Sequence, residues 1–195
     1  MKSHVSTPKS SRRRVKFEKR KRCSRFLNNA LRFIERDISI FPVAASDKFP
    51  ITKRGFKDAT TDAKQIRKWA REFPNANIGI KTGSASSLVF IDLDRKNGVD
   101  GVKAIETPCN QWKIKLPKTY WVQTPSRGKH IFFRSPKYAG KIPIGVNVLA
   151  MGIDIRAEGG YVVAQGSSID GANYKVIEGD LDNIAILPRR LRLKT

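Results

Sequence analysis

The clearest hydrophobic pattern in the chain is an apolar run that ends in two acids. Residues 88–91 are continuously apolar, and Asp92 and Asp94 follow with only Leu93 between them. Such a run is typical of a buried β-strand, in which side chains two positions apart leave the same face with their Cα atoms roughly 7 Å apart. The pattern therefore predicts a strand over 87–93 whose end presents two carboxylates on one side.

Other patterns predict helices mixed with further strands. Apolar residues recur at helical spacing over 24–34 and 62–73, and Ser24 and Asp62 are placed as the N-caps of these two helices. In the second helix, Gln65 is expected to complete a capping box and Trp69 to lie on the buried side. Short helices are also expected near 99–106 and 182–187. Strands are expected over 38–44, 77–80, 120–124, 130–134, 153–157, 161–164 and 174–177. This mixture predicts an α+β (mixed α/β) fold.

Short turns predict how some of these strands pair. The strands at 120–124 and 130–134 are separated by a turn rich in Pro, Ser and Gly, and those at 153–157 and 161–164 by Glu158-Gly159-Gly160. Turns of this composition favour antiparallel hairpins. Both pairs are therefore predicted to form hairpins, and 174–177 is predicted as an edge strand.

Charge divides the chain into two parts. Residues 1–25 contain eleven Lys and Arg against one acid, Glu18, and are predicted to form a disordered basic arm. This arm is either a tether for nucleic acid or a solubilising tail. Residues 26–195 are long enough for one domain, or for two closely packed lobes, with a real core. We expect these residues to form the functional domain.

The overall charge and cysteine content restrict the partners and the compartment. The formal net charge is +22, from 39 basic and 17 acidic residues, which favours a polyanionic partner, nucleic acid before anionic membrane. No apolar run approaches 18 residues, and the first residues lack the apolar core of a signal peptide. Two cysteines give no disulfide framework and no zinc site. We therefore expect a cytoplasmic protein without a membrane partner.

Two further motifs carry polar side chains on predicted strands. His130 opens the apolar strand at 130–134, and Asp154 alternates with apolar neighbours so that it shares a face with Arg156. Each residue also has a simpler interpretation. Asp92 or Asp94 could cap the next turn while the other is solvated, His130 could be a strand-edge histidine, and Arg156 could pair with Glu158.

Taken together, these residues suit phosphoryl or nucleotidyl transfer. That chemistry depends on positioning and charge neutralisation, with carboxylates binding two divalent ions and cations holding the phosphates. Asp92, Asp94 and Asp154 would supply oxygen ligands for Mg²⁺ or Mn²⁺, as hard cations prefer. His130 and Arg156 would hold a triphosphate. Residues 81–86 contain Lys81-Thr82-Gly83 but lack the spacing and following helix of a P-loop, so an ATPase of that type is rejected.

The ordered set of motifs resembles the bifunctional DNA primase/polymerase (prim-pol) domain of the archaeo-eukaryotic primase superfamily. The matching segments are Ile91-Asp92-Leu93-Asp94, Gly128-Lys129-His130 and Ile153-Asp154, with flanking similarity at 41–43, 48–50, 53–62, 77–83 and 159–164. The resemblance extends from about Leu27 to Pro188. Two departures are Arg127 where the family often has a second glycine, and Gln165-Gly166 where it often has prolines.

The resemblance implies a fold, a reaction and its partners. The fold would be a catalytic β-sheet of the RNA-recognition-motif type with flanking helices and an N-terminal lobe. The reaction would be template-directed primer synthesis in replication, with DNA extension as a further capacity, by catalysis with two Mg²⁺ or Mn²⁺ ions on Asp92, Asp94 and Asp154. The partners would be single-stranded DNA, nucleoside triphosphates and a separate replicative helicase, because no helicase motif is present. The nucleotide-binding residues would be His130, Arg156, Lys129, Arg127, Lys48 and Lys53.

Two alternatives share most of these features. A non-catalytic single-stranded DNA-binding module of replication initiation would have the same charge and arm without needing a metal. A template-independent nucleotidyltransferase, or a nucleoside-triphosphate hydrolase, would use the same site. The basic loop at 46–59, which carries Lys48 and Lys53, has the additional interpretation of a solvated surface loop.

Overall fold

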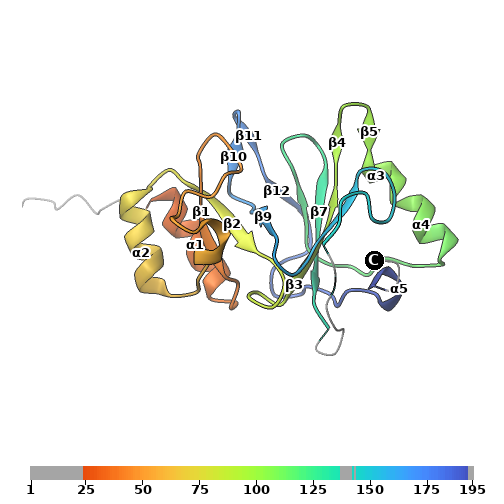
Figure 1. Ribbon diagram of the computed structural model, residues 1–195, viewed down its shortest axis with the longest axis horizontal. Helices are drawn as coiled ribbons and strands as arrows, with labels where there is room; N and C mark the ends of the chain where they lie inside the picture. The colour runs from red at the N-terminus through yellow and green to blue at the C-terminus, as the bar shows by residue number, and fades with distance from the viewer. Residues whose placement is uncertain (1–23, 137–141, 143, 193–195) are drawn as a thin grey trace, which may run out of the picture.

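An antiparallel sheet of five strands lies at the centre of the protein (Figure 1). The computed structural model describes residues 24–136, 142 and 144–192. In spatial order the strands of this central sheet are β12 (Lys175–Glu178), β6 (Trp121–Gln123), β7 (Lys129–Arg134), β3 (Leu88–Leu93) and β8 (Ile153–Arg156). The predicted hairpin of residues 120–124 and 130–134 is confirmed as β6–β7, and the predicted edge strand is confirmed as β12.

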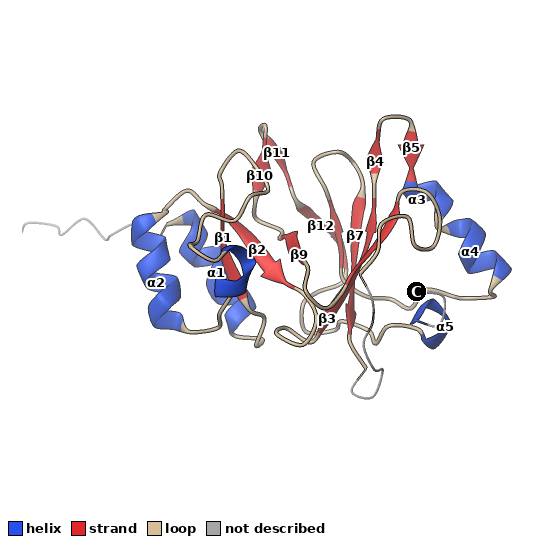
Figure 2. Ribbon diagram, in the orientation of Figure 1, coloured by secondary structure: helices blue, strands red, loops and turns tan. Residues whose placement is uncertain are grey.

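A smaller lobe stands against one face of the central sheet. Its three antiparallel strands are β1 (Ile40–Val43), β2 (Asn77–Lys81) and β9 (Tyr161–Val163), in that order. Helices α1 (Arg25–Ile34) and α2 (Ala63–Glu72) pack on each other beside these strands, and the 3-10 helix η1 (Gly55–Asp58) lies in the loop after β1 (Figure 2). This lobe contains most of the first third of the chain.

The two helices of this lobe begin where the sequence predicts. The Ser24 hydroxyl accepts the Leu27 amide at 3.1 Å, and the Asp62 carboxylate accepts the Lys64 amide at 2.9 Å. Gln65 does not complete the predicted capping box, because the Asp62 amide bonds to the hydroxyl of Thr60. Each cap satisfies an amide that the first turn of the helix leaves unpaired.

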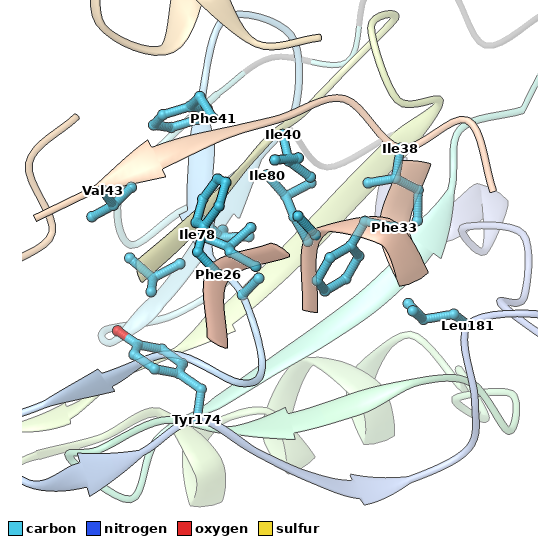
Figure 3. Close-up of a cluster of buried hydrophobic side chains, with 14 of the residues drawn as sticks. Phe26, Phe33, Ile38, Ile40, Phe41, Val43, Ile78, Ile80, Tyr174 and Leu181 are labelled. Atoms are coloured by element: carbon cyan, nitrogen blue, oxygen red, sulfur yellow. The ribbon is translucent and has the colours of Figure 1, made fainter. Parts of the chain in front are cut away.

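Two hydrophobic cores lie on opposite faces of the central sheet. The first joins Phe90, Tyr120, Val122 and Phe132 to the buried side chains of the smaller lobe, including Phe26 and Phe33 of α1 (Figure 3). The second contains side chains of the other face, with Val89, Ile91 and Leu93 from β3. Consecutive residues of β3 therefore serve different cores, as the alternation of a strand requires.

Short elements complete the described residues. They are β4 (Arg95–Lys96), β5 (Val99–Asp100), α3 (Gly101–Ala104), α4 (Glu106–Gln111), β10 (Ser168–Ile169), β11 (Ala172–Asn173) and α5 (Arg189–Arg192). The helix expected near 99–106 is thus shifted, because Val99 and Asp100 pair with β4 and the Asp100 carboxylate accepts the Lys103 amide at the start of α3. Helix α4 lies in a segment for which the sequence pattern predicted an irregular connection.

The predicted hairpin of 153–157 and 161–164 is wrong. Strand β8 pairs with β3 in the central sheet, whereas β9 pairs with β2 in the smaller one. Gly159, at φ +82°, lies in the turn where the chain crosses between the sheets. The physical reason is the division of the core: Ile153 and Ile155 belong to the second core, whereas Val162 and Val163 belong to the first.

The short helix predicted over 182–187 is also wrong. The Asp180 carboxylate accepts the amides of Asp182 and Asn183, which closes a turn. The chain then runs extended beside the end of β7, with the Arg134 amide bonded to Ala185 and the Leu187 amide bonded to Arg134. The Ala185 carbonyl and the Leu187 amide are therefore bonded to β7 and are not available for the hydrogen bonds of a helix.

The α+β class is confirmed, and the RNA-recognition-motif type of the sheet remains a prediction. Residues 1–23 of the predicted arm lie outside the described part of the chain. Arg25, its last residue, opens α1 and hydrogen-bonds through its guanidinium to Asn77 and Ser168. Over 24–136, 142 and 144–192, no helix has the length and apolarity needed to cross a bilayer.

Candidate active site

Three of the predicted site residues form one row across the central sheet. In the antiparallel register, Asp92 of β3 lies directly opposite His130 of β7 on one side and Asp154 of β8 on the other. Directly opposed side chains of neighbouring strands leave the same face, with Cβ atoms about 5 Å apart. The sheet therefore brings together two acids and an imidazole from segments up to 62 residues apart in the sequence.

The alternation of β3 decides which face this row occupies. Phe90, two positions before Asp92, belongs to the first core, so Asp92 points toward the smaller lobe. Gly128 lets β7 begin beside the end of β3, because a Cβ at this position would lie 2.4 Å from the carbonyl oxygen of Leu93. This contact gives a physical reason for the small residue two positions before His130.

Asp94 lies just beyond β3, where its backbone joins two other segments. Its amide donates to the Gly152 carbonyl and its carbonyl accepts the Gly101 amide, both at 2.8 Å. Its side chain forms an ion pair with Lys96, with 2.9 Å between Nζ and Oδ2, and is 21% exposed. This bond is the main cause that raises the pKa of Lys96, with the charges of Asp94, Asp92 and Asp154 adding to it. The Lys96 ammonium thus lies in the field of all three acids.

Asp154 is the most enclosed of the three acids, at 3% exposure. One of its oxygens accepts the Asn147 amide at 2.9 Å, and the other accepts Arg156 Nη2 at 2.7 Å. Asn147, at φ +54°, also accepts the Gly152 amide through its side chain at 2.7 Å. The predicted shared face of Asp154 and Arg156 is confirmed by this ion pair.

His130 is buried beside Asp92. The distance from its Nε2 to Asp92 Oδ1 is 3.5 Å, and its Nδ1 has no hydrogen-bond partner within the described part of the chain. Burial lowers the pKa of His130, and the nearby Asp92 opposes this effect only in part. The imidazole is therefore neutral near pH 7, and it can donate one hydrogen bond but offers no fixed positive charge.

A cleft of about 420 Å³ opens above Asp92 and His130 of this row, between the two sheets. Such a volume is within the usual range for small-molecule sites. Its charged and polar lining comes from both lobes and comprises Lys48, Asp92, Asp94, Lys96, His130 and Arg156. Phe56 and Tyr161 form an aromatic wall, with ring centroids 5.6 Å apart and planes at 29°. The cleft thus combines acids, cations and an aromatic surface.

The predicted cations divide between the cleft and other places. Lys48 and Arg156 line the cleft, whereas Lys53 lines a second hollow beside α2. Lys129 alternates with His130 and lies over the Trp121 ring, 5.4 Å from its centroid, on the side of the second core. Arg127 is exposed in the β6–β7 turn at φ +63°.

Sequence reasoning missed several residues of the site. Lys96 could have been found, because it follows Asp94 by two positions in an extended segment. Asn147 and Tyr174 carry no local signal: Asn147 acts through a loop that reaches Asp154, and Tyr174 joins the lining of the cleft from the start of the edge strand. Their roles depend on contacts between distant segments.

The donor atoms fit a divalent cation in part. Asp92 and Asp94 line the cleft and keep partly exposed carboxylates, which are the oxygen ligands that Mg²⁺ and Mn²⁺ prefer. Asp154 already has a partner on each oxygen. In the described ranges, no three side chains of His, Cys, Asp or Glu lie close enough together to hold a metal ion.

Fold and site together define a mixed α/β protein with a cleft between two antiparallel sheets that is lined by both acids and cations. Residues 30–190 match the family of the bifunctional DNA primase/polymerase N-terminal domain (Prim-Pol). The match covers most of the chain, so the protein belongs to this family. Membership indicates nucleotidyltransferase activity of the DNA primase/polymerase kind, with DNA and nucleotides as substrates. No curated protein matches the sequence.

Proposed function

We propose that this protein is a template-directed nucleotidyltransferase that synthesises primers on single-stranded DNA and extends them during replication. One observation carries the proposal: Asp92 lies between His130 and Asp154 in a single row at a cleft of nucleotide size, in a chain of the primase/polymerase family. Unwinding would be done by a separate helicase. A cytoplasmic location, consistent with two cysteines and no disulfide framework, is part of the proposal.

The acids would hold the metal ions of the reaction. Asp92 and Asp94 would bind the metal ions first. Asp154 would become a ligand once Arg156 no longer hydrogen-bonds to Asp154 Oδ2. Two Mg²⁺ or Mn²⁺ ions, when bound, supply activation of the primer 3′-hydroxyl and neutralisation of the leaving pyrophosphate. Both tasks require carboxylates held in place beforehand, and the short strands β3 and β8 provide this rigidity.

The remaining polar residues would hold the incoming nucleotide. Lys48 and Arg156 offer cations on the two sides of the cleft, where a triphosphate needs charge neutralisation. His130 would contribute a hydrogen bond, because its imidazole is neutral near pH 7. Phe56 and Tyr161 would support the apolar parts of the nucleoside. Lys53, Arg127 and Lys129 lie outside the cleft and would contact the nucleic acid instead of the incoming nucleotide.

The test is de novo synthesis on unprimed single-stranded DNA with labelled nucleotides and Mg²⁺ or Mn²⁺. The wild type should give products only with template, and Asp92→Asn should give none while it still binds DNA. Asp170→Asn is the matched control, since Asp170 is exposed in the β10–β11 turn at φ +49°, which Asn tolerates. Products without template would instead indicate a template-independent enzyme.

A second candidate is a non-catalytic DNA-binding module of replication initiation. The observation that favours it is the pairing of the acids: Asp94 with Lys96, and Asp154 with Arg156. Carboxylates that are already neutralised by Lys96 and Arg156 do not require a metal ion. The same assay decides between the two functions, because intact template binding without product in either metal would support this module.

A further inference from the structure

The solvent side of α2 carries one exposed acid, Glu72, and four exposed cations. The cations are Lys64, Arg67, Lys68 and Arg71. At 3.6 residues per turn these positions fall within about 100° of the helix circumference, opposite the buried Ile66, Trp69 and Ala70. All four side chains belong to exposed residues. We call this surface the basic face of α2.

The basic face has little charge compensation, because Glu72, one helical turn after Lys68, is the one exposed acid of α2. None of its four cations forms an ion pair within the described part of the chain, although Arg36 pairs with Asp182 and Arg54 with Asp58 elsewhere. Lys64 and Lys68 are separated by one helical turn, as are Arg67 and Arg71, and like charges at this spacing oppose helix formation. The helix therefore keeps an arrangement that a polyanion would stabilise.

A single loop connects this face with the active cleft. Lys48 and Phe56 of the loop at 46–59 line the cleft, whereas Lys53 and Arg54 line a second hollow of about 480 Å³. Trp69 of α2 lines the same hollow, together with Gln65. The same hollow is also lined by the acids Asp58, Asp62 and Glu72. Arg54 pairs with Asp58, so Lys53 is the cation of this hollow that forms no ion pair within the described part of the chain. Lys53 lies on the loop that reaches the cleft and beside α2, the helix at one end of the molecule (Figure 1).

We propose that the basic face of α2 and Lys53 form a DNA track, along which the sugar–phosphate backbone runs to the active cleft. The proposal rests on the proposed function for the identity of the polyanion as DNA. Exposed cations in a row suit phosphates, because phosphate contacts position nucleic acid without reading its sequence. Lys53 then belongs to the nucleic-acid path, which accounts for its place outside the cleft.

A lipid surface fits this face less well. Helices that bind membranes present apolar side chains to the acyl region beside their cations. The apolar side chains of α2 are instead buried in the first core, where Ile66 is fully buried and Trp69 is 6% exposed. The basic face offers charge alone.

The experiment compares two variants of the full chain that lose the same charge. The track variant carries Lys64→Gln, Arg67→Gln, Lys68→Gln and Arg71→Gln. The control carries Lys103→Gln, Lys113→Gln, Lys115→Gln and Lys118→Gln, which are exposed positions on and after the short helices of the other lobe. Glutamine keeps helix propensity close to that of Lys and Arg, and circular dichroism during heating checks folding. Binding of a fluorescent single strand is measured by anisotropy across salt concentrations.

The track variant should bind at least tenfold more weakly than the control at low salt. Its log–log salt slope should fall by about 3, since each lost phosphate contact changes the slope by about 0.7. Equal slopes and affinities for the two variants would overturn the track, because only net charge would then matter. If the track variant unfolds, Lys64→Gln/Lys68→Gln is measured against Lys115→Gln/Lys118→Gln, with half the effect expected.

Binding of a nucleoside triphosphate separates this proposal from the proposed function. The track variant should keep the nucleotide affinity of the wild type, because no residue of the basic face lines the cleft. If the track variant alone loses DNA binding and the wild type makes no product, the DNA track is supported and the proposed enzymatic function is overturned. If the wild type synthesises primers and the track variant binds DNA as well as the control does, the enzymatic function is supported and the DNA track is overturned.

Discussion

Asp92 and Asp154 lie directly opposite each other on the neighbouring strands β3 and β8. Opposed like charges destabilise a sheet, so this pair costs folding free energy. The protein reduces the cost locally, through Arg156 and the Asn147 amide on Asp154. Because the arrangement opposes stability, its presence beside a cleft is a reason to expect chemistry there.

The first prediction concerns Lys96 as a counter-ion of the acidic row. Lys96→Met should strengthen Mn²⁺ binding by roughly tenfold, equivalent to about 1.4 kcal/mol, because the ammonium 2.9 Å from Asp94 Oδ2 competes with a cation for that oxygen. Binding is followed by electron paramagnetic resonance of free Mn²⁺. Lys103→Met, an exposed change on α3, should leave binding unchanged. Weaker Mn²⁺ binding in Lys96→Met would show that Lys96 supports the metal site rather than competing for it.

The second prediction treats Asn147 as a positioning residue for Asp154. Asn147→Ala removes the acceptor of the Gly152 amide and strains a left-handed backbone, so the free energy of unfolding should fall by about 1–3 kcal/mol in urea titrations. Asn147→Gly relieves the strain without restoring the acceptor and should recover only part of the stability.

Kinetics separate this positioning role from a purely structural one. Both Asn147 variants should lower kcat of primer synthesis with little change in KM for the nucleotide, because Asp154 does not line the cleft. Full stability in Asn147→Gly together with full kcat would contradict the positioning role.

The third prediction links packing in the smaller lobe to the cleft. In Gly79→Ala the new Cβ would lie 2.2 Å from Cζ of Phe41, a ring that packs edge-on against Tyr161 with centroids 5.3 Å apart. The variant should lose about 1–3 kcal/mol of unfolding free energy and bind nucleotide more weakly. Phe41→Leu should cost less in the Gly79→Ala background than in the wild type. Additive costs in this double-mutant cycle would exclude the clash as the cause.

The fourth prediction tests the basic arm. Deletion of residues 1–23 keeps Ser24, which caps α1, and Arg25, which bonds to Asn77 and Ser168. Ten of the eleven cations of the predicted arm are removed. Binding to single strands should weaken and its salt slope should fall by about 0.7 for each lost phosphate contact. An unchanged slope, measured by anisotropy, would identify the arm as a solubilising tail.

Local patterns predicted most individual elements well. The caps Ser24 and Asp62, the strand at β3 and the hairpin of β6 and β7 follow from propensity, alternation and turn chemistry. The errors occur where distant segments compete with a local preference. Residues 182–187 bond to the end of β7 instead of forming a helix, and β8 and β9 separate although a short Gly-containing turn joins them.

By itself, the sequence determined which side chains share a face within each strand, including Asp154 with Arg156, because the two-residue period is a property of the local backbone. The tertiary structure decided which strands are neighbours. It placed Asp92 between His130 and Asp154, brought Asn147 to Asp154, and put Lys53 outside the cleft. Strand order depends on how side chains distribute between two cores, and that distribution involves contacts that no local pattern contains.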